Sequence, residues 1–168
     1  WTTLSAFTAF EILADVEVVL DDGAAFLPPT PFAYDKPLVF YGSSITEGGC
    51  VSRLTNAYTA ILSRWMDIDY YCLGFSGNAQ GEPEVADYIN SIEKCAFVYD
   101  YDHNAPTADY LDKTHEPFFK RIRAHDPEMP ILMMSRPDFD GGADSVRRRD
   151  IIRRTYENAV AAGDRNVY

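Results

Sequence analysis

The chain of 168 residues has few basic side chains, with 15 Lys and Arg against 26 Asp and Glu, and a formal net charge of −11 at pH 7. This deficit argues against a nucleic-acid partner, because binding phosphates requires a basic surface. It suits a neutral or cationic substrate instead. The basic residues that are present cluster on one predicted helix, where we expect them to form a solvated face: Arg147, Arg148, Arg149, Arg153 and Arg154.

Long apolar runs and paired cysteines are also lacking. No apolar run approaches the about 20 residues that a membrane-spanning helix needs, so we expect no membrane span. Cys50, Cys72 and Cys95 form no Cys-x-x-Cys pair and have no His at zinc-ligand spacing, which predicts neither a metal site nor a cofactor. We interpret them as buried free thiols, with Cys50 as the candidate for pairing with a cysteine outside this chain.

The composition that remains is that of a globular protein, with 46% hydrophobic and 24% charged residues. Residues 1–36 differ from the rest, since 16–20 is a strand candidate, 21–23 a turn and 26–31 a proline-stiffened connection. We interpret 1–36 as the end of a preceding β-rich module with its linker. Residues 37–168 then form the main domain.

From residue 37 onward, short β-branched or aromatic runs alternate with helical patterns. Strands are predicted at residues 38–41, 69–73, 96–101 and 130–134, and 166–168 looks like the opening of a fifth. Helices are predicted at 56–66 with Asn56 as a cap, at 83–92 with Pro83 in the first turn, at 114–124, and at 145–161 before Gly163. This order predicts an α/β fold: a three-layer α/β/α sandwich with a parallel, flavodoxin-like sheet that is incomplete at the C-terminus.

Polar loops follow three of the predicted strands. Residues 37–49, Pro-Leu-Val-Phe-Tyr-Gly-Ser-Ser-Ile-Thr-Glu-Gly-Gly, read as a buried strand that ends in a polar turn with Ser44. The glycine-rich loop 74–81 and the turn Asp102-His103-Asn104 occupy the same position after later strands. Because right-handed crossovers place these loops on one edge of a parallel sheet, they should converge. Acyl transfer needs such an arrangement of a nucleophile with fixed oxyanion donors.

Three blocks along the chain resemble those of the SGNH (GDSL) esterase and lipase superfamily. They are Gly42-Ser43-Ser44-Ile45-Thr46, Phe75-Ser76-Gly77-Asn78 and Tyr101-Asp102-His103-Asn104. The residues around these blocks are similar to those of a bacterial subgroup with an N-terminal β-sandwich module, and this resemblance implies a secreted or periplasmic location. The resemblance implies that Ser44 is the nucleophile and that the Ser44 N–H, the Gly77 N–H and the Asn104 amide form the oxyanion hole.

The sequence departs from the superfamily pattern in three places. Ser43 replaces the usual Asp, and Asp102 replaces a Gly. The superfamily's Asp-x-x-His motif follows the fifth strand, so we expect the general base and its acid outside residues 1–168. We assign His103 a supporting role in its loop, and we expect Arg136 either to line the cleft or to form a structural salt bridge. His115 and His125 bracket a predicted helix and read as surface or capping groups.

Taken together, these features favour a serine esterase that removes a small acyl group, most plausibly acetyl, from a carbohydrate or small-molecule ester. One alternative is a Mg²⁺-dependent phosphatase, because residues 97–102 resemble the strand and Asp-x-Asp pattern of haloacid-dehalogenase-type enzymes, with Asp100 as the nucleophile. The other alternative is a non-catalytic carbohydrate-binding module that keeps the fold without the chemistry.

Overall fold

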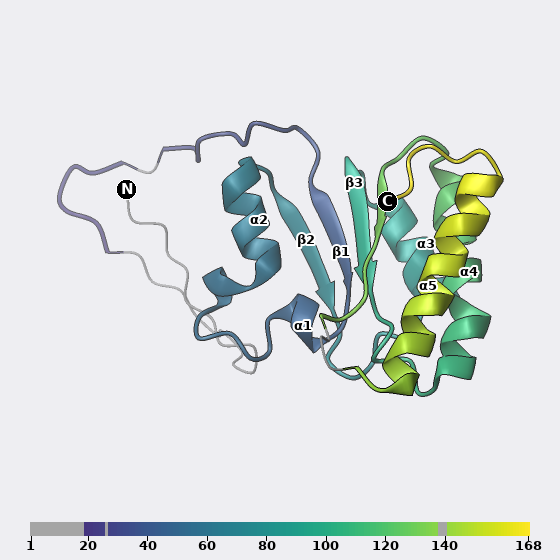
Figure 1. Ribbon diagram of the computed structural model, residues 1–168. Coiled ribbons are helices and arrows are strands. Elements are labelled where there is room, and N and C mark those ends of the chain that lie inside the picture. Colours follow the sequence, from purple (N-terminus) through teal and green to yellow (C-terminus); the bar gives the residue numbers. More distant parts are fainter. Residues whose placement is uncertain (1–18, 26, 138–140) are drawn as a thin grey trace.

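The computed structural model describes residues 19–25, 27–137 and 141–168 (Figure 1). Residues 16–18 of the first predicted strand lie outside these ranges, and the described residues from 19 to 36 contain neither helix nor strand. Their side chains are exposed, and the Ala33 N–H donates to Asp67 O at 2.8 Å. The division of the chain at residue 36 therefore stays a prediction.

The sheet is parallel throughout and has the strand order β2-β1-β3-β4. Its strands are β1 (Leu38–Gly42), β2 (Tyr70–Gly74), β3 (Ala96–Asp100) and β4 (Ile131–Met133). Val167 forms a parallel bridge with Ile131, and the Tyr168 N–H donates to Ile131 O at 3.0 Å. The last residues thus begin a fifth strand beside β4, and the predicted flavodoxin-like order is confirmed.

The helices follow the predicted alternation. They are α1 (Ser44–Glu47), α2 (Tyr58–Met66), α3 (Pro83–Ser91), α4 (Ala108–His125) and α5 (Ala143–Ala161), with a 3-10 turn, η1, at Leu54–Asn56. Gly163 follows α5 with a φ of +93°, a left-handed conformation that favours glycine after a helix end, as predicted.

Two predicted helix starts are wrong. The helix predicted from residue 114 begins at Ala108, because Thr107 Oγ1 accepts a hydrogen bond from the Tyr110 N–H at 3.1 Å and caps α4. Asn56 does not cap α2. It lies in η1 and its side chain donates to Ser52 Oγ at 3.0 Å.

Helices cover both faces of the sheet, with α2 on one side and α3, α4 and α5 on the other (Figure 1). Successive strand residues point to opposite faces, so Val39 and Tyr41 pack with the core of α3, α4 and α5, whereas Leu38 and Phe40 pack with Ile68 on the α2 side. Within the described residues, no helix is long and apolar enough to cross a membrane.

His115 belongs to the larger of the two cores, so its predicted surface or capping role is wrong. It is 1% exposed, its ring stacks on Tyr99 at 4.8 Å, and Nδ1 lies 2.9 Å from Thr155 Oγ1. Burial lowers the pKa of His115 to about 3, so its ring is neutral at pH 7. His125 is exposed in the last turn of α4, as predicted.

The cysteines are less buried than predicted. All of them are free, but Cys50 and Cys72 are exposed and Cys95 is half-buried. Cys72 lies on the edge strand β2, where its thiol donates to Thr46 O at 3.2 Å. The interpretation as buried thiols is therefore wrong for Cys50 and Cys72, because an edge strand and a surface loop carry them.

Candidate active site

The loops that follow β1, β2 and β3 meet at one edge of the sheet, below the strand ends in Figure 1. Parallel strands place their carboxyl ends together, and ligands of open α/β sheets bind at this edge. These loops carry Ser44, Gly77 and Asn104, so the predicted convergence of the three loops is observed.

The turn after β1 presents Ser44 as the first residue of α1. Ser43 is the N-cap of this helix, and its Oγ accepts a hydrogen bond from the Ile45 N–H at 3.1 Å. The other end closes when the N–H groups of Gly48 and Gly49 donate to Ser44 O at 3.0 and 2.8 Å. Ser44 is half-buried, and first-turn N–H groups have no partner within their helix. Ser44 therefore offers both a hydroxyl and a backbone donor at the same place.

Glycines let the loops pack directly on one another. A Cβ at Gly42 would overlap Asp100 Oδ1, and a Cβ at Gly74 would overlap the backbone of Glu47 in α1. The Phe75 N–H also donates to Gly42 O at 2.8 Å, which joins the second loop to the end of β1. The position of the Ser44 turn is therefore fixed by β2 and β3 as well as by its own strand.

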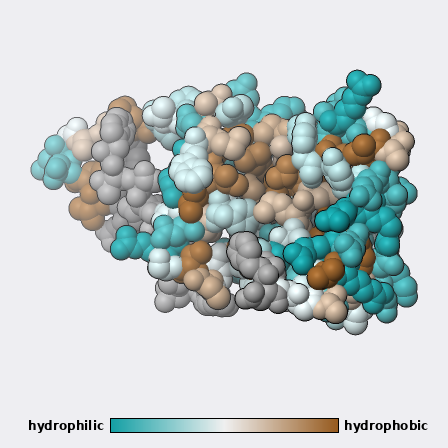
Figure 2. Space-filling view, in the orientation of Figure 1, coloured by the Kyte–Doolittle hydropathy of each residue, from teal (hydrophilic) through white to brown (hydrophobic). Residues whose placement is uncertain are grey.

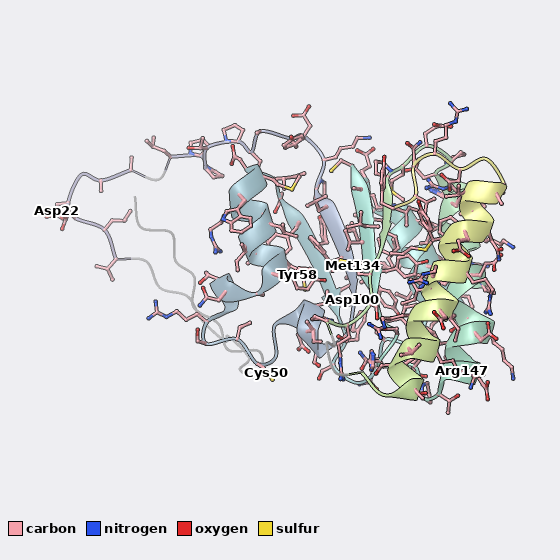
Figure 3. All side chains as sticks on the ribbon, viewed as in Figure 1. Asp22, Cys50, Tyr58, Asp100, Met134 and Arg147 are labelled. Atoms are coloured by element: carbon pink, nitrogen blue, oxygen red, sulfur yellow. The ribbon has the colours of Figure 1, made fainter. Side chains whose placement is uncertain are left out.

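A buried carboxylate, Asp100, underlies this turn. It is 6% exposed, and its Oδ1 accepts hydrogen bonds from the Thr46 hydroxyl and, at 3.4 Å, from the Ser43 N–H. The Tyr58 hydroxyl on α2 donates to Oδ2 at 3.3 Å, and Figure 3 shows the two residues beside each other. Burial raises the pKa of Asp100 to about 6, although these hydrogen bonds partly offset the effect. Asp100 therefore ties the residue before Ser44 to the end of β3.

The second loop contains Gly77, which has a φ of +72° in an exposed turn. The Asn78 N–H donates to Phe75 O at 2.9 Å and closes this turn. The far end of the loop is anchored by Tyr41, whose hydroxyl donates to Glu82 Oε2 at 2.9 Å and accepts from the Gly81 N–H at 2.8 Å. Gly77 thus sits on a short exposed turn that is anchored on both sides.

The third loop presents Asn104, which is half-buried, from a turn whose backbone N–H groups at Asn104 and Ala105 donate to Tyr101 O at 2.9 and 3.2 Å. The Asp102 side chain is 1% exposed and holds this turn from within. It accepts from the Ser135 hydroxyl at 2.6 Å, from the His103 N–H at 2.9 Å and from the Arg136 N–H at 3.4 Å. Asp102 therefore joins the Asn104 turn to the segment that follows β4.

The remaining predicted site residues lie around this turn. His103 is adjacent to Asn104, and its Nε2 lies 3.6 Å from Asp102 Oδ2. Arg136 is exposed and reaches the turn through its backbone N–H. Asp102, His103 and Arg136 are thus gathered at the third loop, and their contributions to chemistry stay predictions. No group of three or more His, Cys, Asp or Glu side chains within the described ranges is placed to hold a metal ion.

Sequence reasoning missed the roles of Asp100 and Arg148 in this site. Asp100 is paired with Gly42 in the β1–β3 register, so the need for a glycine at position 42 was the available signal. Arg148 was assigned to a solvated face, but it is 6% exposed, while the neighbouring arginines on α5 are exposed. Its spacing from the buried residues Ser145 and Ile152 follows a helical period, which was the signal for a buried position.

Several solved structures share this fold. A GDSL-like lipase from Bacteroides ovatus aligns with a TM-score of 0.73 and 28% identity, over 83% of this chain and 43% of that chain. The salicylyl-acyltransferase SsfX3 from a tetracycline biosynthetic pathway aligns with a TM-score of 0.72 and 20% identity, over 89% and 46% of the two chains. A family two carbohydrate esterase from Clostridium thermocellum, in complex with cellohexaose, gives a TM-score of 0.65 and 15% identity, over 85% and 55%.

The chain spans less than half the length of the first two of these proteins. Among curated proteins, none is significantly similar to it. The sequence pattern of the GDSL-like Lipase/Acylhydrolase family matches residues 35–168, which include all three polar loops. The chain therefore belongs to the GDSL-like lipase/acylhydrolase family, as the three sequence blocks implied.

Proposed function

We propose that the protein containing this chain is a serine esterase that cleaves small acyl esters, most plausibly acetyl esters of carbohydrates. The observation that supports the proposal is that the three loops that carry Ser44, Gly77 and Asn104 are joined at one sheet edge by hydrogen bonds and close glycine contacts. A nucleophile surrounded by fixed N–H donors is the arrangement that acyl transfer requires.

The reaction follows from the groups that these loops present. Ser44 Oγ attacks the ester carbonyl while a base takes the hydroxyl proton, and the carbonyl oxygen becomes an oxyanion. The N–H groups of Ser44 and Gly77 and the Asn104 amide donate to this oxyanion. The tetrahedral intermediate then expels the alcohol, which receives the proton from the base. Water cleaves the resulting acyl-enzyme by the same steps and releases the acid.

We propose that the base and its acid lie outside residues 1–168. The chain has three histidines, and His115 is buried in the core while His125 ends α4, at the end of that helix away from the loops. The string Asp112-x-x-His115 matches the superfamily's motif in letters alone, since Asp112 pairs with Arg154 on the surface. His103 is thus the histidine beside the proposed site. We do not assign it as the base, because its neighbour Asn104 is assigned to the oxyanion.

Carbohydrate esters are proposed because the esterase from Clostridium thermocellum, crystallised with cellohexaose, shares this fold. The phosphatase alternative is weakened by Asp100 itself. Its carboxylate is buried and accepts hydrogen bonds from Thr46, Ser43 and Tyr58, so it is not free to attack a phosphate.

The test is Ser44→Ala in the full-length protein, with p-nitrophenyl acetate and a panel of acetylated sugars as substrates. Turnover and labelling by a fluorophosphonate should both be lost, because the acyl-enzyme cannot form. Ser91→Ala is the matched control, since this exposed serine at the end of α3 lies away from the loops and should retain both signals. Wild-type turnover in Ser44→Ala would end the proposal, and oligosaccharide binding without turnover would support the non-catalytic alternative.

A further inference from the structure

Arg148 stands apart from the other arginines of α5. The outer surface of this helix is mostly hydrophilic in Figure 2, and Arg147 extends from its lower end in Figure 3 toward an ion pair with Asp109. Arg148 instead points inward and is 6% exposed. A buried guanidinium needs an explanation, because removing a cation from water costs several kcal/mol unless its donors are satisfied.

The donors of Arg148 are directed at the Asn104 turn. Its Nη1 donates to two backbone carbonyls, those of Asp102 and, at 3.0 Å, of Ala105. These carbonyls lie on either side of Asn104 in the sequence, so one guanidinium nitrogen bridges the two ends of the turn. The Nε donates to Asp144 Oδ2 at 2.7 Å, one turn earlier on α5, which holds the side chain in this orientation.

This arrangement is specific to arginine. A guanidinium has five N–H donors in a planar fork and can bind carbonyls and a carboxylate in fixed directions, whereas a lysine ammonium is a single point charge on a flexible chain. Asp144 is 66% exposed and therefore contributes little stability by itself. The hydrogen bonds to the carbonyls of Asp102 and Ala105 therefore account for the burial of Arg148.

We propose that Arg148 is a positioning residue that sets the geometry of the Asn104 turn and thereby aims the Asn104 amide at the oxyanion. The inference rests on the proposed esterase function. Asp102 anchors the turn to Ser135 after β4, and Arg148 anchors it to α5, so the turn is held from two sides. Loss of Arg148 leaves the Asp102 anchor in place and loosens the turn without removing it.

The kinetic test compares Arg148→Ala, Asn104→Ala and the double variant in the full-length protein, with p-nitrophenyl acetate as substrate. Arg148→Ala should lower kcat by about 100-fold with KM nearly unchanged, since a donor misplaced by about 1 Å costs this much. In the Asn104→Ala background the same substitution should have almost no further effect, because the group that it positions is gone. Added guanidinium should restore part of the kcat of Arg148→Ala, and Arg148→Lys should restore little.

Arg147→Ala is the matched control, since it removes a neighbouring arginine whose ion pair with Asp109 is on the surface. It should behave as the wild type. If the kinetic losses of Arg148→Ala and Asn104→Ala multiply in the double variant, Arg148 does not act through Asn104 and the proposal is wrong.

A second measurement does not depend on turnover. Hydrogen exchange at the backbone amides of residues 101–107 should become faster in Arg148→Ala, while exchange at residues 75–80 in the Gly77 loop stays unchanged. Unchanged exchange at 101–107 would overturn the positioning role even if activity fell. Ser44→Ala could show that the protein is no serine esterase. Faster exchange confined to residues 101–107 would then still show that Arg148 holds the Asn104 turn, and only the catalytic role of this contact would be refuted.

Discussion

Asp100→Asn tests whether the Ser44 turn rests on a buried charge. The substitution keeps the hydrogen-bond geometry, because the asparagine oxygen can accept from the Thr46 hydroxyl and the Ser43 N–H as Oδ1 does. The asparagine NH₂ then faces the Tyr58 hydroxyl, which can accept a hydrogen bond as readily as it donates one to Oδ2. The main change is therefore the removal of a negative charge from a site that is 6% exposed.

The magnitude follows from the pKa of Asp100, which burial raises from 3.8 to about 6. A carboxyl with a higher pKa in the folded protein binds its proton more tightly there than in the unfolded chain. Its contribution to stability is present below pH 3.8 and is lost as the pH rises through about 6. At neutral pH the free energy of unfolding is therefore about 3 kcal/mol lower with Asp100 ionised than it would be with Asp100 protonated.

We expect the stability of Asp100→Asn relative to the wild type to increase by about 2–3 kcal/mol between pH 4 and pH 8. Urea unfolding of both proteins across this range measures the difference, and contributions from other titrating groups, such as His115, cancel in it. Asp22→Asn removes the same charge from an exposed turn and should show no such pH-dependent gain. If the difference in the free energy of unfolding between Asp100→Asn and the wild type does not change with pH, the buried charge is refuted.

The other predictions concern the loops around Ser44. Asn104→Ala should lower kcat by about 10²–10³-fold with little change in KM, the loss typical of one oxyanion donor, and an effect on KM alone would contradict its role. His103→Ala in the full-length protein should retain most of the kcat for p-nitrophenyl acetate, because the base is expected outside residues 1–168, and a loss as large as that of Ser44→Ala would make His103 the base. Gly42→Ala should destabilise the protein by about 1–3 kcal/mol in urea unfolding, since its Cβ would overlap Asp100 Oδ1, and an unchanged stability would contradict this close approach.

Strand and helix order could be predicted because the local pattern and the tertiary structure agree. The apolar runs that form β1 and β3 are buried along most of their length, and each is followed by polar loop residues. The start of α4 could not be found in this way, since it depends on a single side-chain cap by Thr107, and the helix continues through Pro117, a residue that usually ends one.

The burial of individual polar side chains was harder to predict, because it is decided by contacts far along the chain. His115 is enclosed by Tyr99 from β3 and Thr155 from α5, and neither neighbour is near it in sequence. Arg148 lies within a run of arginines whose other members are exposed, so the charge of this run predicts an exposed position for Arg148 as well. The helical spacing from Ser145 to Ile152 outweighs composition here, since it places Arg148 on the buried stripe of α5.

These buried groups explain how loops of different origin can keep a fixed separation. Asp100 ends β3 and binds the Ser43 N–H, while Asp102, two residues later, anchors the turn that carries Asn104. The residue before the proposed nucleophile and the residue proposed for the oxyanion are thus both held by residues 100–105. Because this short segment continues a central strand and is clamped from α5 by Arg148, its position is set by the core of the domain. Loss of the hydrogen bonds that either side chain accepts, as in Asp100→Ala or Asp102→Ala, should therefore alter the spacing between Ser44 and Asn104 even where neither carboxylate touches the substrate.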